Sequence, residues 1–349
     1  MSLGTAMNFR GSRGRITYSS VGVNRVARER SREAIASRLY NDSVSYRLGR
    51  PIHLPFGLVY PAGFDGKYFD LQIEGVGTKT LLAELTGRYE TIGIDAVAMA
   101  VNDVIRSGSR PVLISDAIHI SRPDLKVGSL IKGVRAGAKL SDCILASGET
   151  GNVSEILHAE TTKLSPPFDL IVSCLGSANR PDLIKGDISE GDSIIGLGSS
   201  GIHSNGLTLA RKILLRPWGG LYDPWFKHDI IGREIVEELL VPTAIYAKGL
   251  AHVQRGLKIK GAIHITGDGF SKFRRLLTWQ RKFKQSKAKI GFKFELLKPM
   301  PAIFRLIFEA AKIRKTPISI AEMFRTFNMG YGFAIIVAQK DADRALDSL

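Results

Sequence analysis

Four glycine-centred segments divide this chain, and each lies at or just after a run of apolar residues that is typical of a strand. In chain order they are Glu74–Lys79 (EGVGTK), Gly148–Gly151 (GETG), Gly201–Gly206 (GIHSNG) and Thr266–Gly269 (TGDG). Glycine has no Cβ, so its amide can approach an anion closely or adopt a positive φ. Because the segments also carry acids, hydroxyls, an amide and a cation, they indicate strands that end in phosphate-binding and metal-binding loops.

Strand, turn and helix patterns alternate in both halves, which predicts an α/β (α+β) fold. A chain of 349 residues is long for one hydrophobic core. We expect an arm over residues 1–50 and two mixed sheet-and-helix domains over 51–178 and 179–349. The boundary is placed near 178 because the polar segment that follows contains Pro181 and Gly186.

Apolar periodicity predicts the individual elements. In the first half, strands are expected at Phe56–Tyr60, Tyr68–Ile73, Pro111–Ala117, Cys143–Ala146 and Leu170–Leu175, and helices at Ser31–Arg47, Ile94–Ser107 and Leu125–Leu140. In the second half, strands are expected at Ser193–Leu197, Ala262–Thr266 and Phe333–Ala338, and helices at Gly206–Leu215, Glu234–Leu240, Ala244–Arg255 and Lys272–Leu277.

The formal net charge is +16, which raises the possibility of a nucleic-acid partner. The charge is dispersed except for a basic cluster between Lys272 and Lys289, and no zinc-finger, RRM or basic-zipper pattern accompanies it. A solvated helix face and loop explain that cluster more simply. Nucleic acid is therefore not expected as a partner.

The sequence predicts a cytoplasmic protein. No apolar run reaches the roughly 18 residues that cross a bilayer, and the arginines near the N-terminus lead into polar residues rather than into the apolar stretch of a signal peptide. Cys143 and Cys174 lie in apolar surroundings without a Cys-x-x-Cys partner. They are interpreted as small buried hydrophobes in a reducing compartment.

Five acids border glycine or strand-end positions, and Asn102 stands beside one of them. The acids are Glu74, Asp95, Asp103, Asp116 and Glu149. Magnesium prefers oxygen ligands and usually bridges carboxylates to substrate phosphates. Each acid alone is more simply a surface or capping residue, but the set favours a metal–phosphate site.

The segment Glu74–Lys79 is not a Walker A loop, because it lacks the G-x-x-x-x-G-K-[ST] spacing. It nevertheless offers glycine amides, the Thr78 hydroxyl and the Lys79 ammonium within six residues. Lys79 is a candidate to neutralise a transferring phosphoryl group. The alternative is a solvated lysine at the start of a helix.

The segment around His203, Ser204 and Asn205 combines a proton carrier with groups that can hold a phosphate or an amide. A local turn in which Asn205 caps the next helix is the alternative. Thr266–Gly269 is a candidate for a second phosphate, although the string by itself is hardly more than an ordinary turn.

Together these strings resemble the phosphoribosylformylglycinamidine cyclo-ligase (aminoimidazole ribonucleotide synthetase) family of purine biosynthesis, from about Tyr18 to Leu349. The most specific strings are Glu74–Lys79, Thr91–Met99, Val101–Val104, Gly198–Gly206, Ile265–Phe270 and Glu322–Gly330, and Tyr18–Val23 resembles the family's N-terminal start.

The resemblance implies ATP-dependent closure of formylglycinamidine ribonucleotide to aminoimidazole ribonucleotide, with magnesium, by a homodimer formed through the N-terminal sheet domain. Domain 51–178 would then bind ATP and dimerise, and domain 179–349 would bind the substrate. Carried over by motif, the ATP-binding residues would be Gly75, Gly77, Thr78, Lys79, Asp95 and Asn102; the metal ligands Glu74, Asp103, Asp116 and Glu149; the substrate-binding residues His203, Ser204, Asn205, Thr266 and Gly267; and the catalytic residues Lys79 and His203.

The chain departs from the family pattern at several places. Glu74 stands where the family usually has aspartate, and Asp268 replaces a glycine of the usual Thr-Gly-Gly-Gly, which places a carboxylate near a proposed phosphate. Gly151–Ser154 replaces a proline-containing acidic stretch, and Leu349 comes before the expected final strand.

Two alternatives stay open. One is a same-fold enzyme with another acceptor, such as thiamine-phosphate kinase, selenophosphate synthetase or the amidotransferase of the preceding purine step. The strings His203–Gly206 and Arg325–Gly330 favour the cyclo-ligase among these. The other alternative is a non-catalytic paralogue that binds nucleotide, or nucleic acid through its basic face.

Overall fold

The structure is a computed structural model that describes residues 15–23, 26–27, 30–31, 49–122, 127–159, 167–285, 290–295 and 299–349. Nearly all of the helix expected at Ser31–Arg47, and the first residues of the one expected at Leu125–Leu140, lie outside the described residues. A short 3-10 helix, η1 (Ser19–Val21), comes first, and the Tyr18 amide ahead of it donates to Glu322 Oε1 at 3.1 Å.

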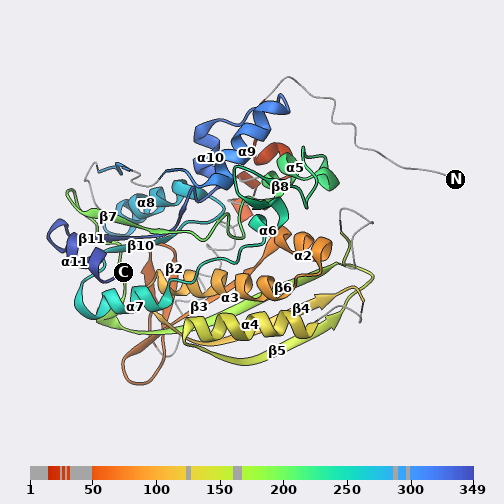
Figure 1. Cartoon of the computed structure of the whole chain (residues 1–349). Helices are drawn as coiled ribbons and strands as arrows, with labels where there is room; N and C mark the ends of the chain where they lie inside the picture. Colours follow the sequence, from red (N-terminus) through yellow and green to blue (C-terminus); the bar gives the residue numbers. More distant parts are fainter. Residues whose placement is uncertain are drawn as a thin grey trace.

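The first half forms a mixed six-stranded sheet in the order β1-β2-β3-β6-β4-β5 (Figure 1). Its strands are β1 (Ile52–Leu54), β2 (Gly57–Pro61), β3 (Lys67–Gly75), β4 (Arg110–Ile120), β5 (Ile144–Asn152) and β6 (Phe168–Asn179). Only the β4–β5 pair within this sheet is parallel. The side chains of β6 alternate between buried and half-buried along the strand, as expected when one face of a sheet packs on the core.

Helices α3 (Glu90–Ile105) and α4 (Val127–Ser141) cover one face of this sheet, and α2 (Thr80–Thr86) precedes them (Figure 1). The two long helices approach closely because glycines lie between them. A Cβ on Gly93 would lie 2.3 Å from the Leu130 carbonyl oxygen, and one on Gly133 would lie 1.9 Å from that of Glu90. Gly133 of α4 and Gly93 of α3 therefore allow the two helices to pack at this distance.

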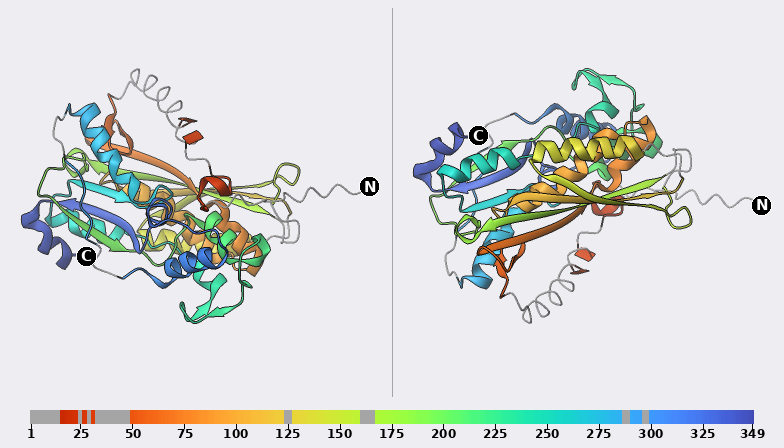
Figure 2. Two further views of the ribbon diagram at one scale, coloured as in Figure 1. Left: turned by 90° about the horizontal axis from the view of Figure 1, so that it is seen from above. Right: turned by 90° about the horizontal axis from the view of Figure 1, so that it is seen from below.

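The opposite face of the sheet keeps large apolar side chains at the surface. Leu71 and Ile73 on β3 are 65% and 68% exposed, and Ile144 on β5 is 64% exposed. In the right view of Figure 2, the yellow helix α4 and the neighbouring α3 lie on the other side of this sheet. A contiguous apolar surface of this kind is typical of a protein interface.

The second half is built on a three-stranded antiparallel sheet in the order β10-β11-β7. Its strands are β7 (Ser193–Gly198), β10 (Gly261–His264) and β11 (Tyr331–Val337), with a small ribbon of β8 (Lys227–His228) and β9 (Arg233–Glu234). The helices are α5 (Leu207–Leu214), α6 (Ile235–Leu239), α7 (Ala247–Gly256), α8 (Phe273–Phe283), α9 (Ala302–Ile313), α10 (Ile320–Thr326) and α11 (Ala342–Asp347). Short 3-10 turns occur in both halves: η3 (Gly77–Lys79), η4 (Arg180–Asp182), η5 (Arg216–Trp218), η6 (Gly269–Lys272) and η7 (Gln339–Asp341).

One apolar core joins the two halves. Val97 and Val101 of α3 belong to the same buried cluster as Leu250 of α7 and Phe333 of β11. Burial of apolar surface across the junction is the dominant force that holds such halves together. The second sheet therefore lies close to the helical face of the first, and polar groups of both halves meet at this junction.

The predicted fold class is confirmed, and most predicted strands and helices overlap observed ones within a few residues. Two local predictions are wrong. The Gly148–Gly151 segment is not a loop after a strand, because β5 continues through it in register with β4. Asn205 does not cap α5, because the N-cap position is Gly206 at φ 82°. The proposed domain boundary stays a prediction. Within the described residues, no helix combines the length and the apolar composition needed to cross a membrane.

Candidate active site at the junction of the two halves

The first glycine segment turns outward at the end of β3. Gly75, Gly77 and Thr78 are exposed, and Gly77 has φ +58° with open space where a Cβ would stand. The Thr78 hydroxyl lies 3.0 Å from the hydroxyl of Thr208 on α5, so the segment faces the second half. Open backbone of this kind beside two hydroxyls suits an approaching phosphate.

Lys79 turns inward instead. Its ammonium nitrogen lies 2.7 Å from Asp95 Oδ2 and donates to the Val241 carbonyl oxygen at 2.8 Å, and the Lys79 and Asp95 side chains are fully buried. Asp95 Oδ1 accepts the Thr243 amide at 2.8 Å and the Ser204 hydroxyl at 3.1 Å. Burial lowers the pKa of Lys79, and the Asp95 carboxylate opposes that effect. The predicted contact of Lys79 and Asp95 with ATP would require this buried pair to open.

Asn102 is also buried at the junction. Its Nδ2 donates to the Ala244 carbonyl oxygen at 2.8 Å, and its Oδ1 accepts the Tyr246 amide at 3.1 Å. The oxygen and the nitrogen of the side-chain amide are thus both bound to the segment before α7. This geometry ties the two halves together, and the predicted ATP contact of Asn102 stays a prediction.

His203 is buried in a strained backbone position with φ +62°. Its Nε2 lies 3.2 Å from the Ser200 amide and 3.4 Å from the Ala244 amide, so this nitrogen accepts and the proton is assigned to Nδ1. Burial, followed by the neighbouring His264 and Lys79, lowers the pKa of His203 well below its usual value. In this arrangement His203 accepts from two backbone amides, and its predicted catalytic role stays a prediction.

Ser204 and Asn205 are half-buried at the same turn. The Ser204 hydroxyl is also 3.2 Å from the Thr243 hydroxyl, and Asn205 Nδ2 points to Met99 Sδ at 3.7 Å. The Asn205 amide makes only this weak contact with sulfur in the part of the chain that the structure describes. It is therefore the more available of the two for a ligand.

Five ionisable residues from both halves lie near one another at the junction, and we call this set the charge centre: Glu74 on β3, Asp103 on α3, Arg106 at the C-cap of α3, His264 on β10 and Lys272 on η6. Asp103 is its hub. Its Oδ2 lies 2.9 Å from the Arg106 guanidinium, and its Oδ1 lies 2.7 Å from His264 Nδ1. The Lys272 ammonium donates to the Thr266 hydroxyl.

The charge centre has perturbed proton affinities. Burial raises the pKa of Glu74 to about 7, and the adjacent Asp103 carboxylate acts in the same direction. Burial lowers the pKa of Lys272 to about 8, against the attraction of Asp103. Burial alone would raise the pKa of Asp103, but Arg106, the hydrogen bond with His264 and nearby Lys272 hold it far below its usual value. Such shifts are frequent at functional sites.

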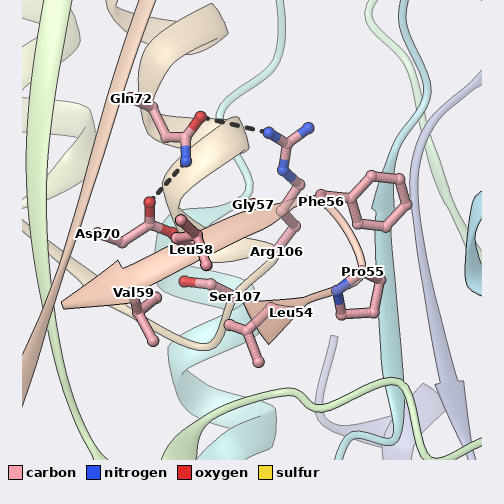
Figure 3. Close-up of a pocket in the computed structure, with 10 residues that line it drawn as sticks. All are labelled: Leu54, Pro55, Phe56, Gly57, Leu58, Val59, Asp70, Gln72, Arg106 and Ser107. Carbon is pink, nitrogen blue, oxygen red and sulfur yellow. Dashed lines mark hydrogen bonds between the residues drawn. The ribbon is translucent and has the colours of Figure 1, made fainter. Parts of the chain in front are cut away.

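A second layer of side chains supports Arg106 (Figure 3). The guanidinium donates to Gln72 Oε1 at 3.3 Å, and Gln72 Nε2 donates to Asp70 Oδ1 at 2.6 Å. On its other side, the guanidinium carbon lies 5.1 Å from the centre of the Phe56 ring. These contacts fix the guanidinium from two sides, because a cation over an aromatic face is attracted to the ring.

The Thr266–Gly269 segment borders the charge centre. Thr266 and Gly267 are buried, and the backbone turns at Gly269, where φ is +51°. The Asp268 carboxylate lies 3.3 Å from the Arg275 guanidinium. The carboxylate that replaces the family's glycine is therefore compensated by a cation of α8.

The four acids predicted as metal ligands do not form one cluster. Asp116 points to the helical face of the sheet, where a Cβ on its β5 neighbour Gly148 would lie 2.8 Å from Oδ1. Glu149 is exposed and pairs in register with Ala117, so its side chain lies on the opposite face. Among the described residues, no three His, Cys, Asp or Glu side chains are placed to hold a metal ion. The four acids therefore do not converge within the described residues, and their individual roles as metal ligands stay predictions.

Three members of the charge centre were missed by sequence reasoning. Lys272 was placed in a solvated basic cluster, but it is buried. Arg106 follows Asp103 by three residues, and this helical spacing could have revealed the ion pair. His264 ends β10 two residues before Thr266, and this closeness in sequence was the available signal.

Comparison with known proteins places this geometry in a family. The model of the AIR synthase related protein N-terminal domain matches residues 60–178, and that of the C-terminal domain matches residues 189–274. Phosphoribosylformylglycinamidine cyclo-ligases are similar over nearly the whole chain. The one from Thermococcus kodakarensis is 34% identical, with 96% of this chain and 92% of its own length covered, and the one from Pyrococcus horikoshii is 35% identical, with 96% and 91% covered.

Solved structures resemble the fold at low sequence identity. The tt0281 protein of Thermus thermophilus has a TM-score of 0.57 and 16% identity over 90% of this chain and 88% of its own. Hydrogenase maturation protein HypE has a TM-score of 0.51 and 16% identity over 80% of this chain and 74% of its own. These two support the architecture alone. Both halves match the family models and the cyclo-ligases match nearly end to end; the chain therefore belongs to the phosphoribosylformylglycinamidine cyclo-ligase family of AIR synthase related proteins.

Proposed function

We propose that this protein is an ATP-dependent cyclo-ligase that closes formylglycinamidine ribonucleotide to aminoimidazole ribonucleotide and releases ADP and phosphate, in purine biosynthesis. The observation that carries the proposal is similarity to cyclo-ligases at 34% identity over 96% of the chain. The geometry agrees with it, since Thr78 of the first half and Thr208 of the second lie 3.0 Å apart beside open glycine backbone.

In the proposed reaction, the γ-phosphoryl group of ATP moves to the formyl oxygen, which makes this oxygen part of a good leaving group. The amidine nitrogen then attacks the same carbon, phosphate departs with the oxygen, and the nitrogen loses a proton. Such a reaction depends mainly on alignment of the two nucleotides and on stabilisation of phosphoryl charge. Gly75, Gly77 and Thr78 are proposed to contact the ATP phosphates.

The second half is proposed to hold the ribonucleotide. Thr266 and Gly267 border the charge centre, and Ser204 and Asn205 lie at the same junction. Lys272 adds a buried cation beside Thr266, which suits a phosphate or a developing negative charge. Each of these contacts is part of the proposal.

Magnesium is proposed as the companion of ATP. It is usually held by one or two carboxylates together with substrate phosphates. Asp103 does not fit this role, because it is already paired with the Arg106 cation, which repels a metal ion, and Asp116 and Glu149 lie on opposite faces of the sheet. We therefore propose that magnesium is held by the ATP phosphates and that Asp103, Asp116 and Glu149 are not among its ligands.

A homodimer is proposed to form through the uncovered face of the six-stranded sheet. Leu71, Ile73 and Ile144 would lose their exposure to water there, and apolar burial stabilises association. A cytoplasmic location is proposed as well. Cys143 and Cys174 are both unpaired, which agrees with a reducing compartment.

A coupled assay tests the activity. The full chain is incubated with ATP, magnesium and formylglycinamidine ribonucleotide, and ADP and aminoimidazole ribonucleotide are measured together. Equal amounts of both products are expected. ADP without the imidazole would point to another acceptor, and nucleotide binding without turnover would point to a non-catalytic paralogue.

A matched pair of glycine variants tests the ATP site. Gly77 and Gly87 both have positive φ and open space at the Cβ position, but Gly87 ends α2 away from the glycine segment. Gly77→Ala and Gly87→Ala therefore carry similar backbone strain. Only Gly77→Ala is expected to raise KM for ATP, because its methyl group occupies space proposed for the phosphate. Equal effects of the two variants would contradict this assignment.

A further inference from the structure

Both oxygens of Asp103 are engaged by side chains of the protein itself. His264 Nδ1 lies 2.7 Å from Oδ1, and the Arg106 guanidinium lies 2.9 Å from Oδ2. The Asp103 side chain is 6% exposed and that of Arg106 is 8% exposed. A metal ion that bound Asp103 would have to share these oxygens with two buried partners, one of them the Arg106 cation, which repels it.

Arg106 is not free to move away from Asp103. Gln72 accepts a hydrogen bond from the guanidinium, and the Phe56 ring packs against the guanidinium carbon at 5.1 Å (Figure 3). The side-chain amide nitrogen of Gln72 donates in turn to Asp70. Asp70 holds Gln72, and Gln72 and Phe56 hold Arg106. The guanidinium is therefore preorganised beside the Asp103 carboxylate.

Charge is also balanced within the charge centre. The two carboxyl groups of Glu74 and Asp103 meet two cationic side chains, Arg106 and Lys272, with His264 as a hydrogen-bond partner. Paired carboxylates in a nucleotide site are ordinarily neutralised by a divalent ion. Here Arg106 contacts Asp103 directly, and the nearby charge of Lys272 acts on both carboxyl groups, so the chain supplies cations of its own.

We propose that Arg106 and Lys272 replace a divalent metal ion at the Glu74–Asp103 pair, and that Arg106 is the positioning residue that fixes Asp103. This inference deepens the proposed function, and it rests on that function only for the role of the site in nucleotide chemistry. Divalent metal then reaches the protein with the phosphates of ATP. The nucleotide-free protein has no metal site at Asp103.

The test measures metal binding without nucleotide, so its outcome is independent of the activity assay. Mn²⁺ is titrated into the full chain, and free Mn²⁺ is followed by electron paramagnetic resonance for the wild type and for Asp103→Asn. We expect identical titrations. A wild-type site that Asp103→Asn abolishes would overturn the inference.

Arg106 variants sharpen the test. Arg106→Met removes the cation and should create a Mn²⁺ site, which the double variant Arg106→Met/Asp103→Asn should lose. Arg106→Lys, which keeps a cation, should not gain the site, and neither should Arg274→Met, at an exposed arginine of α8. A folded Arg106→Met protein that gains no site would also overturn the inference. If Arg106→Met does not fold by circular dichroism, the comparison of the wild type with Asp103→Asn decides alone.

Discussion

The Lys79 ammonium lies 2.7 Å from the Asp95 carboxylate, and neither side chain has any exposure to solvent. Lys79 ends the first glycine segment and Asp95 lies on α3. The second half contributes Val241, whose carbonyl oxygen accepts from Lys79, and Thr243, whose amide donates to Asp95. The pair therefore joins three parts of the chain at one buried point. The glycine backbone before Lys79 stays outside and open to a ligand.

Lys79→Met is expected to destabilise the protein by about 3 to 5 kcal/mol, because it leaves the Asp95 carboxylate buried without its cation. The free energy of unfolding from a urea titration measures the loss. The control is Lys132→Met, which removes an exposed ion pair with Glu90 and should cost less than about 1 kcal/mol. A Lys79→Met protein that is as stable as the wild type but has no turnover would contradict this expectation and would indicate that Lys79 contacts ATP directly.

Leu71→Asp is expected to convert the proposed dimer into monomers, because a carboxylate at this position on the open sheet face would be buried without a partner in the interface. The molar mass from sedimentation equilibrium measures the change. Ile313→Asp is the control, since Ile313 is 61% exposed on α9 in the other half. Dissociation by both substitutions, or by neither, would contradict the proposed interface.

The elements of this fold could be predicted because their signals are local. Small and apolar residues at helical spacing predict α3, and continuous apolar runs predict β6 and β11. The extension of β5 through Gly148–Gly151 could not be read in the same way, because glycine, and to a lesser degree glutamate, are depleted in strands. The pairing partner β4, not local propensity, determines that extension.

The candidate site was only partly predictable because its charges are paired across long separations. A lysine beside glycines suggests exposure, yet the partner that buries Lys79 is an acid on another helix. Asp103 contacts His264, which lies 161 positions away in the sequence, and no local sequence pattern predicts such a contact. The glycine segments indicated where ligands can approach, while the folded chain decides which acids already have partners.

Asp70 is expected to make stability depend on pH. Burial raises its pKa from 3.8 to about 6, although hydrogen bonds from Ser107 and Gln72 and the charge of Arg106 oppose the rise. The folded state then binds more protons than the unfolded state between about pH 4 and 6, so this group lowers stability as the pH rises through that window. Asp70→Asn removes the effect. Its stability relative to the wild type should therefore rise by up to roughly 3 kcal/mol across the window.

Urea titrations at several pH values measure this difference. Asp343→Asn, at an exposed position of α11, supplies the baseline for the loss of a carboxyl group. A difference between Asp70→Asn and the wild type that stays constant from about pH 4 to 6 would show that Asp70 does not titrate in this range.

Arg275→Met is expected to raise KM for the ribonucleotide with little change in kcat. Arg275 lies 3.3 Å from Asp268, and both side chains are partly exposed beside the segment proposed to bind the substrate phosphate. Without the guanidinium, the Asp268 carboxylate repels that phosphate, in the bound ground state and in the transition state alike. Asp268→Gly alone should leave KM near the wild-type value or lower it, and Arg275→Met/Asp268→Gly should restore most of the loss. Steady-state kinetics for the four proteins form a double-mutant cycle that isolates the coupling of the pair. If the losses of the two single variants simply add, Arg275 acts on the substrate itself rather than through Asp268.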